Sequence, residues 1–477
     1  MAKYRRVIHW FRRDLRLTDN TALSRAVAVS DEVIPLYVVS DWKGDHAWTG
    51  AGRQQFLAGC LKSLAANVEH SGGRLIFRRG QADEVIDTLI SESGADALFF
   101  NRDPDPFGKS MEEKLAKVCQ KHGIDCVGSK DAVLHEAGEA LTGSGGPYKV
   151  FTPYSRKWFG LEKEEPVGVV SELRTPDEVI GDGIPSAEVW GQKFEGALLR
   201  EPGERAARIR LKNAIGGAIG EYSENRNDPF ADATSHLGAD LRYGTLSVRE
   251  VFHAAEKARE DARSGIVRES IGNFQRQLAW REFFIAILSH YPEVLKYEFN
   301  PVWRGLEWDD PDDGDRLQKW KEGRTGFPIV DAGMRQLSAT GFMHNRVRMI
   351  TAMFLTKDLH VDWRHGEQHF MQYLLDGEIA CNNGGWQWSA GTGADAAPYF
   401  RIQNPWSQTK RYDPEGRYIK RWLPELEKVE PRRFYQPPPP DERLSPDYPL
   451  PMADHGEERL NTLERFKRHR SAVVATK

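Results

Sequence analysis

The stretch DGEIACNNGGWQW, residues 376–388, crowds carboxylates, amides, glycines and tryptophans into one short run. It follows neither the spacing of an amphipathic helix nor the alternation of a strand, and its glycines interrupt both patterns. We therefore predict a turn between two helices that lines a pocket. Carboxylates suit ribose hydroxyls or an arginine, amides suit the edge of a heteroaromatic ring, and indoles stack on such rings. The run indicates a flavin or nucleotide site, and the alternative is a glycine-rich helix connection with core tryptophans.

Composition sets the limits for the rest of the chain. A length of 477 residues exceeds what one hydrophobic core usually serves and predicts two domains. A net charge of −4 gives no global basic field, so nucleic acid would need a local cationic face. The four cysteines are scattered without metal-like spacing, which predicts reduced thiols and no metal site. With no signal-peptide core and no long apolar run, we expect a soluble, cytoplasmic protein without membrane contact.

The first third of the chain alternates strand-like and helix-like runs. The predicted strands are residues 7–11, 33–39, 74–79, 97–100 and 124–128. The predicted helices are residues 20–30, 53–70, 82–93 and 110–122. Gly72, Gly94 and Gly123 follow three of these helices, where left-handed caps are expected. The alternation predicts an α/β domain, residues 1–134, with a doubly wound parallel sheet.

Beyond residue 134 the composition changes twice. Residues 135–203 are rich in Gly, Pro, Glu and Ser and are predicted to be an interdomain linker. Residues 204–435 show helical periodicity and few strand signals, which predicts an all-α C-terminal domain, and residues 436–477 are expected to form a tail or a short basic helix. The glycine run at residues 216–220 is expected to allow close helix packing, and residues 49–53 to lead into a helix, because neither fits a dinucleotide loop.

Several long motifs resemble the photolyase/cryptochrome family, closest to cyclobutane pyrimidine dimer photolyases. They are HWFRRDLRL from residue 9, TGFPIVDAGMRQL from residue 325, GFMHNRVRM from residue 341, WQWSAGTGADAAPYFRIQNP from residue 386 and KRYDPEGRYIKRWLPEL from residue 410. The resemblance extends to about residue 430, and long motifs in the right order are more specific than one short pattern.

The resemblance implies FAD in the helical domain, reduced and anionic in the active state. The matching cofactor positions are Tyr222, Thr234, Ser235, His236, Leu237, Gly238, Phe274, Gln277, Arg281, Asn345, Arg348, Phe370, Asp376, Gly377, Glu378 and Asn382. Residues 234–238 would offer backbone amides to phosphate. Here the chain departs from the family, which often has Arg in place of His236 and Ser in place of Gly238. Asn382 would face the flavin N5, where a neutral amide tolerates the anionic flavin and favours repair.

The resemblance also implies a catalytic electron relay and a DNA site. The relay would be Trp386, Trp363 and Trp308, with core packing as the alternative, and Asn382 completes the catalytic set. The DNA contacts would be Gln277, Trp280, Asn345, Arg346, Met349, Trp388, Arg401, Gln408 and Lys410. Trp280 and Trp388 would hold a flipped dimer, since photolyases are among the enzymes known to flip their target, and Met349 argues against (6-4) lesions.

Two further features qualify this assignment. Cyclobutane-dimer enzymes usually have Glu at the position of Gln277, so a reduced repair yield, an altered lesion choice and a cryptochrome role are all open. His365 and His369, at i and i+4 on a polar helix, could suggest a metal site, but we expect a solvated face.

Together these residues predict light-driven repair of cyclobutane pyrimidine dimers in UV-damaged DNA by a monomeric enzyme. The alternatives are a cryptochrome-type photoreceptor without repair and a nucleotide-binding protein without photochemistry. The family can also hold an antenna chromophore, a deazaflavin or a folate, in the first domain. Phe107 and Gly108 stand where folate-binding members have an Asn-Glu pair, which argues against folate.

Overall fold

The computed structural model describes residues 3–40, 48–191, 198 and 200–475. The chain forms two compact units, which are described separately. Unit 1 comprises Met1–Ser223 and Ser235–Pro292, and unit 2 comprises Glu224–Thr234 and Glu293–Lys477. The domain boundaries proposed from the sequence stay a prediction.

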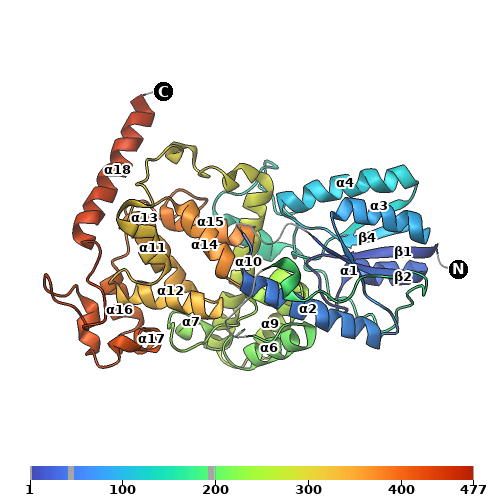
Figure 1. Cartoon of the computed structure of the whole chain (residues 1–477), viewed down its shortest axis with the longest axis horizontal. Helices are drawn as coiled ribbons and strands as arrows, with labels where there is room; N and C mark the ends of the chain where they lie inside the picture. Colours follow the sequence, from blue (N-terminus) through green and yellow to red (C-terminus); the bar gives the residue numbers. More distant parts are fainter. Residues whose placement is uncertain (1–2, 41–47, 192–197, 199, 476–477) are drawn as a thin grey trace. The chain divides into compact units, whose positions relative to one another are not determined.

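Unit 1 is built on a five-stranded parallel sheet in the order β3-β2-β1-β4-β5. The strands are β1 (Tyr4–Phe11), β2 (Ser30–Val39), β3 (Ile76–Arg79), β4 (Ala97–Asn101) and β5 (Asp125–Ser129). The connecting helices are α1 (Thr21–Val29), α2 (Ala51–His70), α3 (Ala82–Ser93) and α4 (Pro106–His122). Helices α3 and α4 cover one face of the sheet, and α2 lies on the other side (Figure 1). The predicted doubly wound α/β fold is confirmed.

Local signals explain most boundaries in this sheet domain. Gly94 and Gly123 cap α3 and α4 in left-handed conformations, with φ of 63° and 67°, as expected. Helix α4 begins at Pro106 rather than Ser110, because the Asp105 side chain accepts a hydrogen bond from the Gly108 amide and proline suits a first helical turn. The loop before α2 leads into that helix, as predicted.

The rest of unit 1 is helical. Its elements are α5 (Phe151–Gly160), η1 (Ala187–Trp190), α6 (Glu204–Gly216), α7 (Tyr222–Asn225), α8 (Gly238–Tyr243), α9 (Val248–Asp261) and α10 (Gly265–His290), with α7 crossing into unit 2. The expectation for residues 216–220 was wrong. Helix α6 ends at Gly216, where an added Cβ would meet nothing within 4 Å, and Cβ atoms added at Gly217 and Gly220 would make only ordinary contacts of 3.5 Å or more, so the run ends a helix and no close approach requires its glycines.

Unit 2 is helical throughout its named elements, which confirms the predicted all-α C-terminal fold. They are η2 (Pro292–Leu295), η3 (Pro301–Trp303), η4 (Asp313–Asp315), α11 (Arg316–Lys321), α12 (Pro328–Thr340), α13 (Asn345–Lys357), α14 (Trp363–Tyr373), α15 (Ile379–Ala390), α16 (Pro405–Tyr412), α17 (Arg417–Trp422), η5 (Pro424–Leu426), η6 (Pro431–Tyr435) and α18 (His455–Ala475). Its core is rich in buried aromatic residues, including Trp320, Trp363 and Trp386. Across the described ranges, no helix has both the length and the apolar character needed to cross a bilayer.

The turn predicted for residues 376–388 is only partly present. It occupies the junction between α14 and α15, but Ile379–Ala390 is a continuous helix that runs through the glycines. Helix α15 is buried on several sides by Ala380, Asn382, Trp386 and Ala390, so it has no polar face to produce helical periodicity. The predicted C-terminal helix is present and long, as α18.

Candidate functional site

One face of α10 in unit 1 carries the residues predicted to contact flavin and dimer. Phe274 is buried and lies edge-on to Tyr222, with ring centroids 6.0 Å apart. The amide nitrogen of Gln277 donates to the Asn273 carbonyl at 3.2 Å. Arg281 donates to the Ala132 carbonyl at 2.9 Å, so its guanidinium also holds the chain that follows the sheet.

Trp280 is held by a residue that the sequence did not single out. Phe151 of α5 stacks on the Trp280 indole, with centroids 3.6 Å apart and planes within 10° of each other. Trp280 itself is half-buried, whereas Phe151 is 5% exposed. One face of the indole is therefore covered from within unit 1.

The segment predicted to cradle phosphate is a turn that enters the short helix α8. Leu237 is the N-cap residue, and its amide lies 3.5 Å from the Ser235 hydroxyl. His236 has φ of 53°, a left-handed conformation that is uncommon for a residue other than glycine. Such backbone strain is often kept at ligand-binding turns, where it directs amides toward the ligand.

Arg348 and Asp376 form the ion pair that the sequence predicted in unit 2. One guanidinium nitrogen lies 2.9 Å and 3.1 Å from the two carboxylate oxygens. Arg348 also donates from Nε to the Met343 carbonyl at 2.7 Å, which fixes the plane of the guanidinium. Gly377 and Glu378 follow directly, and Glu378 is a buried N-cap residue of α15.

Asn382 is oriented by a glutamate that sequence analysis missed. Its amide nitrogen donates to the backbone carbonyl of Glu367 at 2.9 Å, which directs the amide oxygen away from α14. Asn383 donates to the Glu367 carboxyl group at 2.9 Å. Burial raises the pKa of Glu367 to about 8. A single buried residue thus positions both amides of the NN pair.

Two of the three relay tryptophans are buried in the core of unit 2. Trp363 is fully buried, and its Nε1 donates to the Glu298 carboxylate at 3.4 Å. Trp386 packs against the backbone of α14, where an added Cβ on Gly366 would lie 2.1 Å from the indole. Phe370, a predicted cofactor contact, is 2% exposed and lies edge-on to Trp386 at 4.9 Å.

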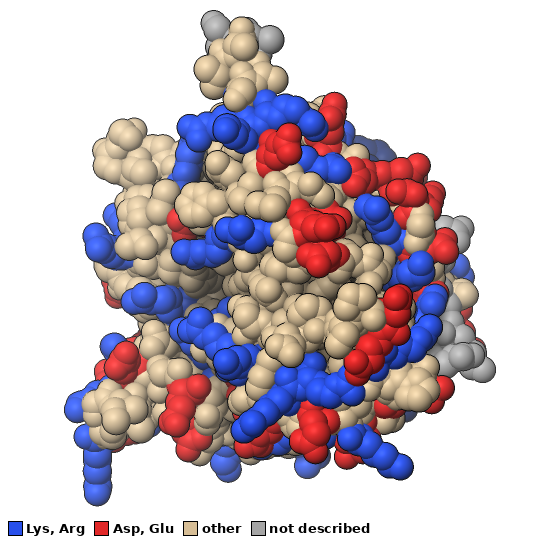
Figure 2. Space-filling view, turned by 90° about the vertical axis from the view of Figure 1, so that its left-hand side faces the viewer, with Lys and Arg blue, Asp and Glu red and all other residues tan. Residues whose placement is uncertain are grey.

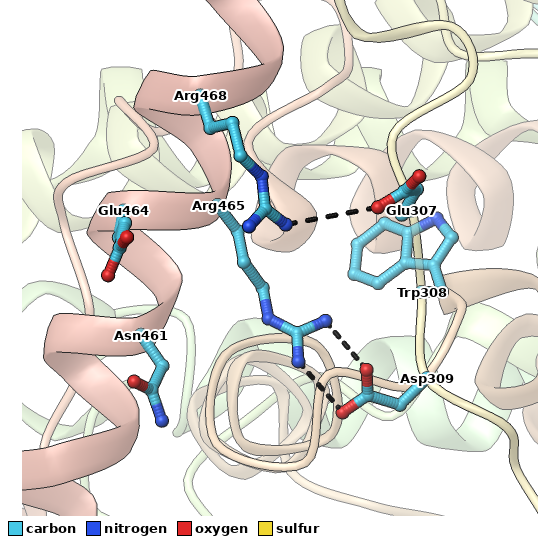
Figure 3. A pocket seen from close by; sticks show the side chains of 7 residues that line it. All are labelled: Glu307, Trp308, Asp309, Asn461, Glu464, Arg465 and Arg468. Carbon is cyan, nitrogen blue, oxygen red and sulfur yellow. Dashed lines mark hydrogen bonds and ion pairs between the residues drawn. The ribbon is translucent and has the colours of Figure 1, made fainter.

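Trp308, the third relay residue, lies at the surface of unit 2. Its indole lines a pocket of about 540 Å³. Figure 3 shows the indole facing α18 across this pocket. Arg465 of α18 pairs with both oxygens of Asp309 at 2.6 Å and 3.1 Å, and Arg468 lies 3.8 Å from Glu307. The helix that the sequence assigned to a tail therefore forms one wall around Trp308.

Three of the predicted DNA contacts, Asn345, Arg346 and Met349, lie together on α13. The Met349 sulfur lies 4.0 Å from the Asn345 amide and 3.8 Å from the Arg346 guanidinium. Arg346 also donates to Asn227 at 2.7 Å and lies over the Tyr412 ring at 4.5 Å. Burial lowers the pKa of Arg346, yet its partners keep the guanidinium beside the thioether.

The remaining predicted DNA contacts of unit 2, which are the dimer-stacking Trp388 and the backbone contacts Arg401, Gln408 and Lys410, are partly or fully accessible. Trp388 and Gln408 are half-buried, while Arg401 and Lys410 are exposed. Figure 2 shows Lys and Arg gathered in bands, with Asp and Glu between them, on the side where α16 and α18 lie in Figure 1. Cationic side chains are thus gathered locally on this side, next to anionic ones, although the net charge is negative.

The prediction that His365 and His369 lie on a solvated helix face is wrong for His369. Its side chain is 7% exposed and contacts the Trp320 ring at 5.6 Å, and burial lowers its pKa to about 3. His365 is half-buried. The helix α14 looked polar because its buried face is formed by His369, Glu367 and Gly366 together with aromatic residues.

The residues within each unit fit a flavin nucleotide chemically. Unit 2 provides a buried amide whose oxygen can accept from a ring N–H, beside a carboxylate held by arginine. Unit 1 provides a strained turn that can present backbone amides to phosphate.

Comparisons with known proteins agree with this chemistry. Family profiles described as DNA photolyase and as the FAD binding domain of DNA photolyase match residues 7–170 and 274–468. A deoxyribodipyrimidine photo-lyase of Synechococcus sp. is 38% identical over 461 residues, 94% of each chain. A class III photolyase structure from Agrobacterium tumefaciens has a TM-score of 0.91 at 36% identity and covers 99% of both chains. A Synechocystis sp. cryptochrome has a TM-score of 0.88 at 28% identity, covering 97% of this chain and 100% of its own. The family resemblance is confirmed, and the chain belongs to the DNA photolyase family.

Proposed function

We propose that the protein is a deoxyribodipyrimidine photo-lyase, which uses light to split cyclobutane pyrimidine dimers in UV-damaged DNA. The observation that carries this proposal is the buried Asn382 amide, oriented by Glu367, in a chain whose relatives over nearly their full length are named as such lyases. A neutral amide at this position tolerates an anionic flavin.

The protein's residues would bind, orient and exclude water. Bound reduced FAD supplies light absorption and the transferred electron. Asn382 would offer its oxygen to the edge of the flavin ring, and the paired Arg348 and Asp376 would hold the ring from unit 2. The other cofactor positions that the family resemblance implies belong to the same proposal. Trp386, Trp363 and Trp308 would pass electrons from the protein surface to the flavin after the flavin has become oxidised.

The substrate assignment rests on aromatic and sulfur groups. Trp280 and Trp388 would stack on the flipped bases, and Met349 would contact the dimer rather than a (6-4) lesion. Gln277 would donate its amide N–H to a base carbonyl, without the acidic proton that a glutamate could supply. Arg346, Arg401 and Gln408 would position the DNA backbone without reading sequence.

The proposal extends to the protein's other properties. An antenna chromophore other than folate would bind at the carboxyl edge of the unit 1 sheet, the usual ligand edge of such folds. Phe107 there is 67% exposed, and an added Cβ on Gly108 would lie 2.4 Å from Asp103. We further propose a cytoplasmic location, since the four cysteines form no disulfide, and a monomeric state.

The test is light-dependent loss of cyclobutane thymine dimers from a synthetic oligonucleotide. Purified, anaerobically reduced protein is assayed with a dark control and with (6-4) lesions in parallel. Repair of cyclobutane dimers only in light supports the lyase, and Gln277→Glu should raise the yield. A flavin that photoreduces while neither lesion is repaired would contradict the lyase and support a photoreceptor.

A further inference from the structure

Two cysteines of unit 1 lie against each other where helix α4 ends and strand β5 begins. Cys119 belongs to the last turn of α4, and Cys126 is the second residue of β5. The Cys119 thiol donates a hydrogen bond to the Cys126 sulfur. Both side chains are free thiols. The two sulfur atoms are therefore neighbours in the folded protein without being bonded to each other.

The backbone holds these two cysteines together. Gly123 ends α4 with φ of 67°, and the Ile124 amide donates to the Cys119 carbonyl at 3.1 Å. Strand β5 is parallel to β4, so it runs back along the helix that connects them. Only residues 120–125 lie between the two cysteines, and α4 packs on β5. The local fold thus brings Cys126 beside the last turn of the helix.

The two thiols differ in their access to water. Cys119 is 1% exposed and belongs to the hydrophobic core of the sheet domain, which also contains Leu115 and Leu98. Cys126 is exposed, and its strand β5 forms one edge of the sheet. A small polar solute can therefore reach the Cys126 sulfur from water, whereas the core covers the Cys119 sulfur.

The hydrogen bond between the thiols favours the reactive form of the exposed one. Donation by Cys119 lowers the pKa of Cys126 and raises that of Cys119, because it stabilises the Cys126 thiolate. The Glu112 carboxylate opposes this effect, yet the pKa of Cys126 remains lowered. The thiolate is the nucleophilic form of cysteine. The exposed member of the pair is thus also the more nucleophilic one.

We propose that Cys126 and Cys119 form a peroxide-reactive pair, in which hydrogen peroxide oxidises Cys126 and Cys119 then closes a disulfide with it. An accessible thiol beside a second thiol that resolves it is the arrangement found in redox-sensing cysteines. A transient disulfide of this kind is compatible with a reducing compartment. The inference concerns unit 1 alone and does not rest on the light-driven reaction.

The atoms and electrons balance over two steps. The Cys126 thiolate attacks the peroxide, so an S–O bond forms, the O–O bond breaks, and the departing hydroxide takes up the proton that the thiol had released. The Cys119 sulfur then attacks the Cys126 sulfur, so the S–S bond forms and the S–O bond breaks. The departing oxygen leaves as water with the Cys119 proton. Each sulfur loses one electron in total, and the peroxide accepts both.

The disulfide would protect the exposed cysteine and connect two elements. A sulfenic acid that meets no second thiol can be oxidised further to the sulfinic acid, which is irreversible for most proteins. Closure by Cys119 stops Cys126 at a stage that a thiol in solution can reverse by exchange. It would also link the edge strand β5 covalently to the helix that covers it.

The experiment treats the purified, reduced full-length protein with hydrogen peroxide in the dark. The remaining thiols are alkylated in denaturant, and trypsin then cuts after Lys117, Lys121 and Lys130, which separates the two cysteines. Mass spectrometry should find peptides 118–121 and 122–130 joined by a disulfide, and reductant should release them. Cys60, which is buried in α2, should be recovered alkylated and serves as the internal control.

Variants separate the roles of the two thiols. Cys119→Ala should leave a Cys126 sulfenic acid that dimedone traps, whereas Cys126→Ala should leave Cys119 reduced. Cys119→Ala should also move the pH profile of Cys126 alkylation by iodoacetamide to higher pH, because the thiolate loses its donor. Cys60→Ala removes a buried thiol elsewhere and should change neither result.

Three results would overturn the pair. They are a Cys126 sulfenic acid that dimedone traps in the wild-type protein without any linked peptides, a disulfide that joins Cys126 of two molecules on a non-reducing gel, and oxidation of Cys60 as fast as that of Cys126. Because the wild-type protein supplies each of these observations, the test stands even where a variant does not fold. The dimer-repair assay has no part in it, so the two proposals fail independently.

Discussion

The backbone of Gly366 lies so close to the Trp386 indole that an added Cβ would sit 2.1 Å from the ring. Gly366→Ala should therefore push the indole out of place. It should lower the free energy of unfolding by about 1–3 kcal/mol, as in other overpacked cores. We expect slower flavin photoreduction, measured as bleaching of the oxidised flavin band. Gly385→Ala on α15 is the control, because its Cβ would meet nothing within 4 Å. Equal slowing in both variants would contradict the role of this contact.

Phe151 should strengthen damaged-DNA binding through its stack on Trp280. Phe151→Leu keeps most of the buried volume but loses a ring pair that is worth about 0.5–1.5 kcal/mol. We expect the Kd for dimer-containing DNA to rise by up to about tenfold, with little change for undamaged DNA. A fluorescence-anisotropy titration measures both. Equal weakening for both DNAs would indicate general damage to the fold.

Glu367 should make the folded protein less stable as pH rises. Burial raises its pKa to about 8 from 4.5, so the folded state holds a proton that the unfolded state releases between these values. The associated stability is complete below pH 4.5 and declines up to about pH 8, by at most a few kcal/mol. Glu367→Gln should flatten this decline in thermal unfolding, whereas Glu427→Gln, at an exposed position, should not. An unchanged slope in Glu367→Gln would refute the assignment.

Lys357 should make the folded protein more stable as pH rises, the opposite of Glu367. It is buried, donates to the Ala390 carbonyl at 2.6 Å and lies 3.8 Å from the Phe466 ring centroid, and burial lowers its pKa to about 7 from 10.5. The unfolded state then binds more protons between these values, so stability rises from pH 7 to 10.5. Lys357→Met should remove this rise in denaturant unfolding curves, and exposed Lys428→Met is the control. A persistent rise in Lys357→Met would show that another group titrates.

The sheet domain was predictable because its local signals agree with its tertiary structure. The run Val7–Phe11 is buried on both sides and reads as continuous apolar sequence, and Gly94 and Gly123 end their helices where expected. Helix α15 was mistaken for a turn because burial of Asn382, Trp386 and Ala390 leaves no periodic polar face.

The candidate site shows the same limit. The pairing of Arg348 with Asp376 could be inferred from motifs, since both lie within matching stretches. Glu367 and His369 could not, because a buried glutamate or histidine in a charged-looking helix reads as solvent-facing until its neighbours are known. Phe151 is far from Trp280 in sequence, and only the fold brings the rings together.

The packing of α18 decides where the chain can be shortened. Phe466 is 3% exposed and contacts Trp303 and the Tyr399 ring, and Arg465 holds Asp309 beside Trp308. Protein cut before His455 would expose this aromatic surface and the Lys357 ammonium to water. Such a truncated chain should aggregate rather than behave as a trimmed catalytic core, so expression tags belong after this helix and not in its place.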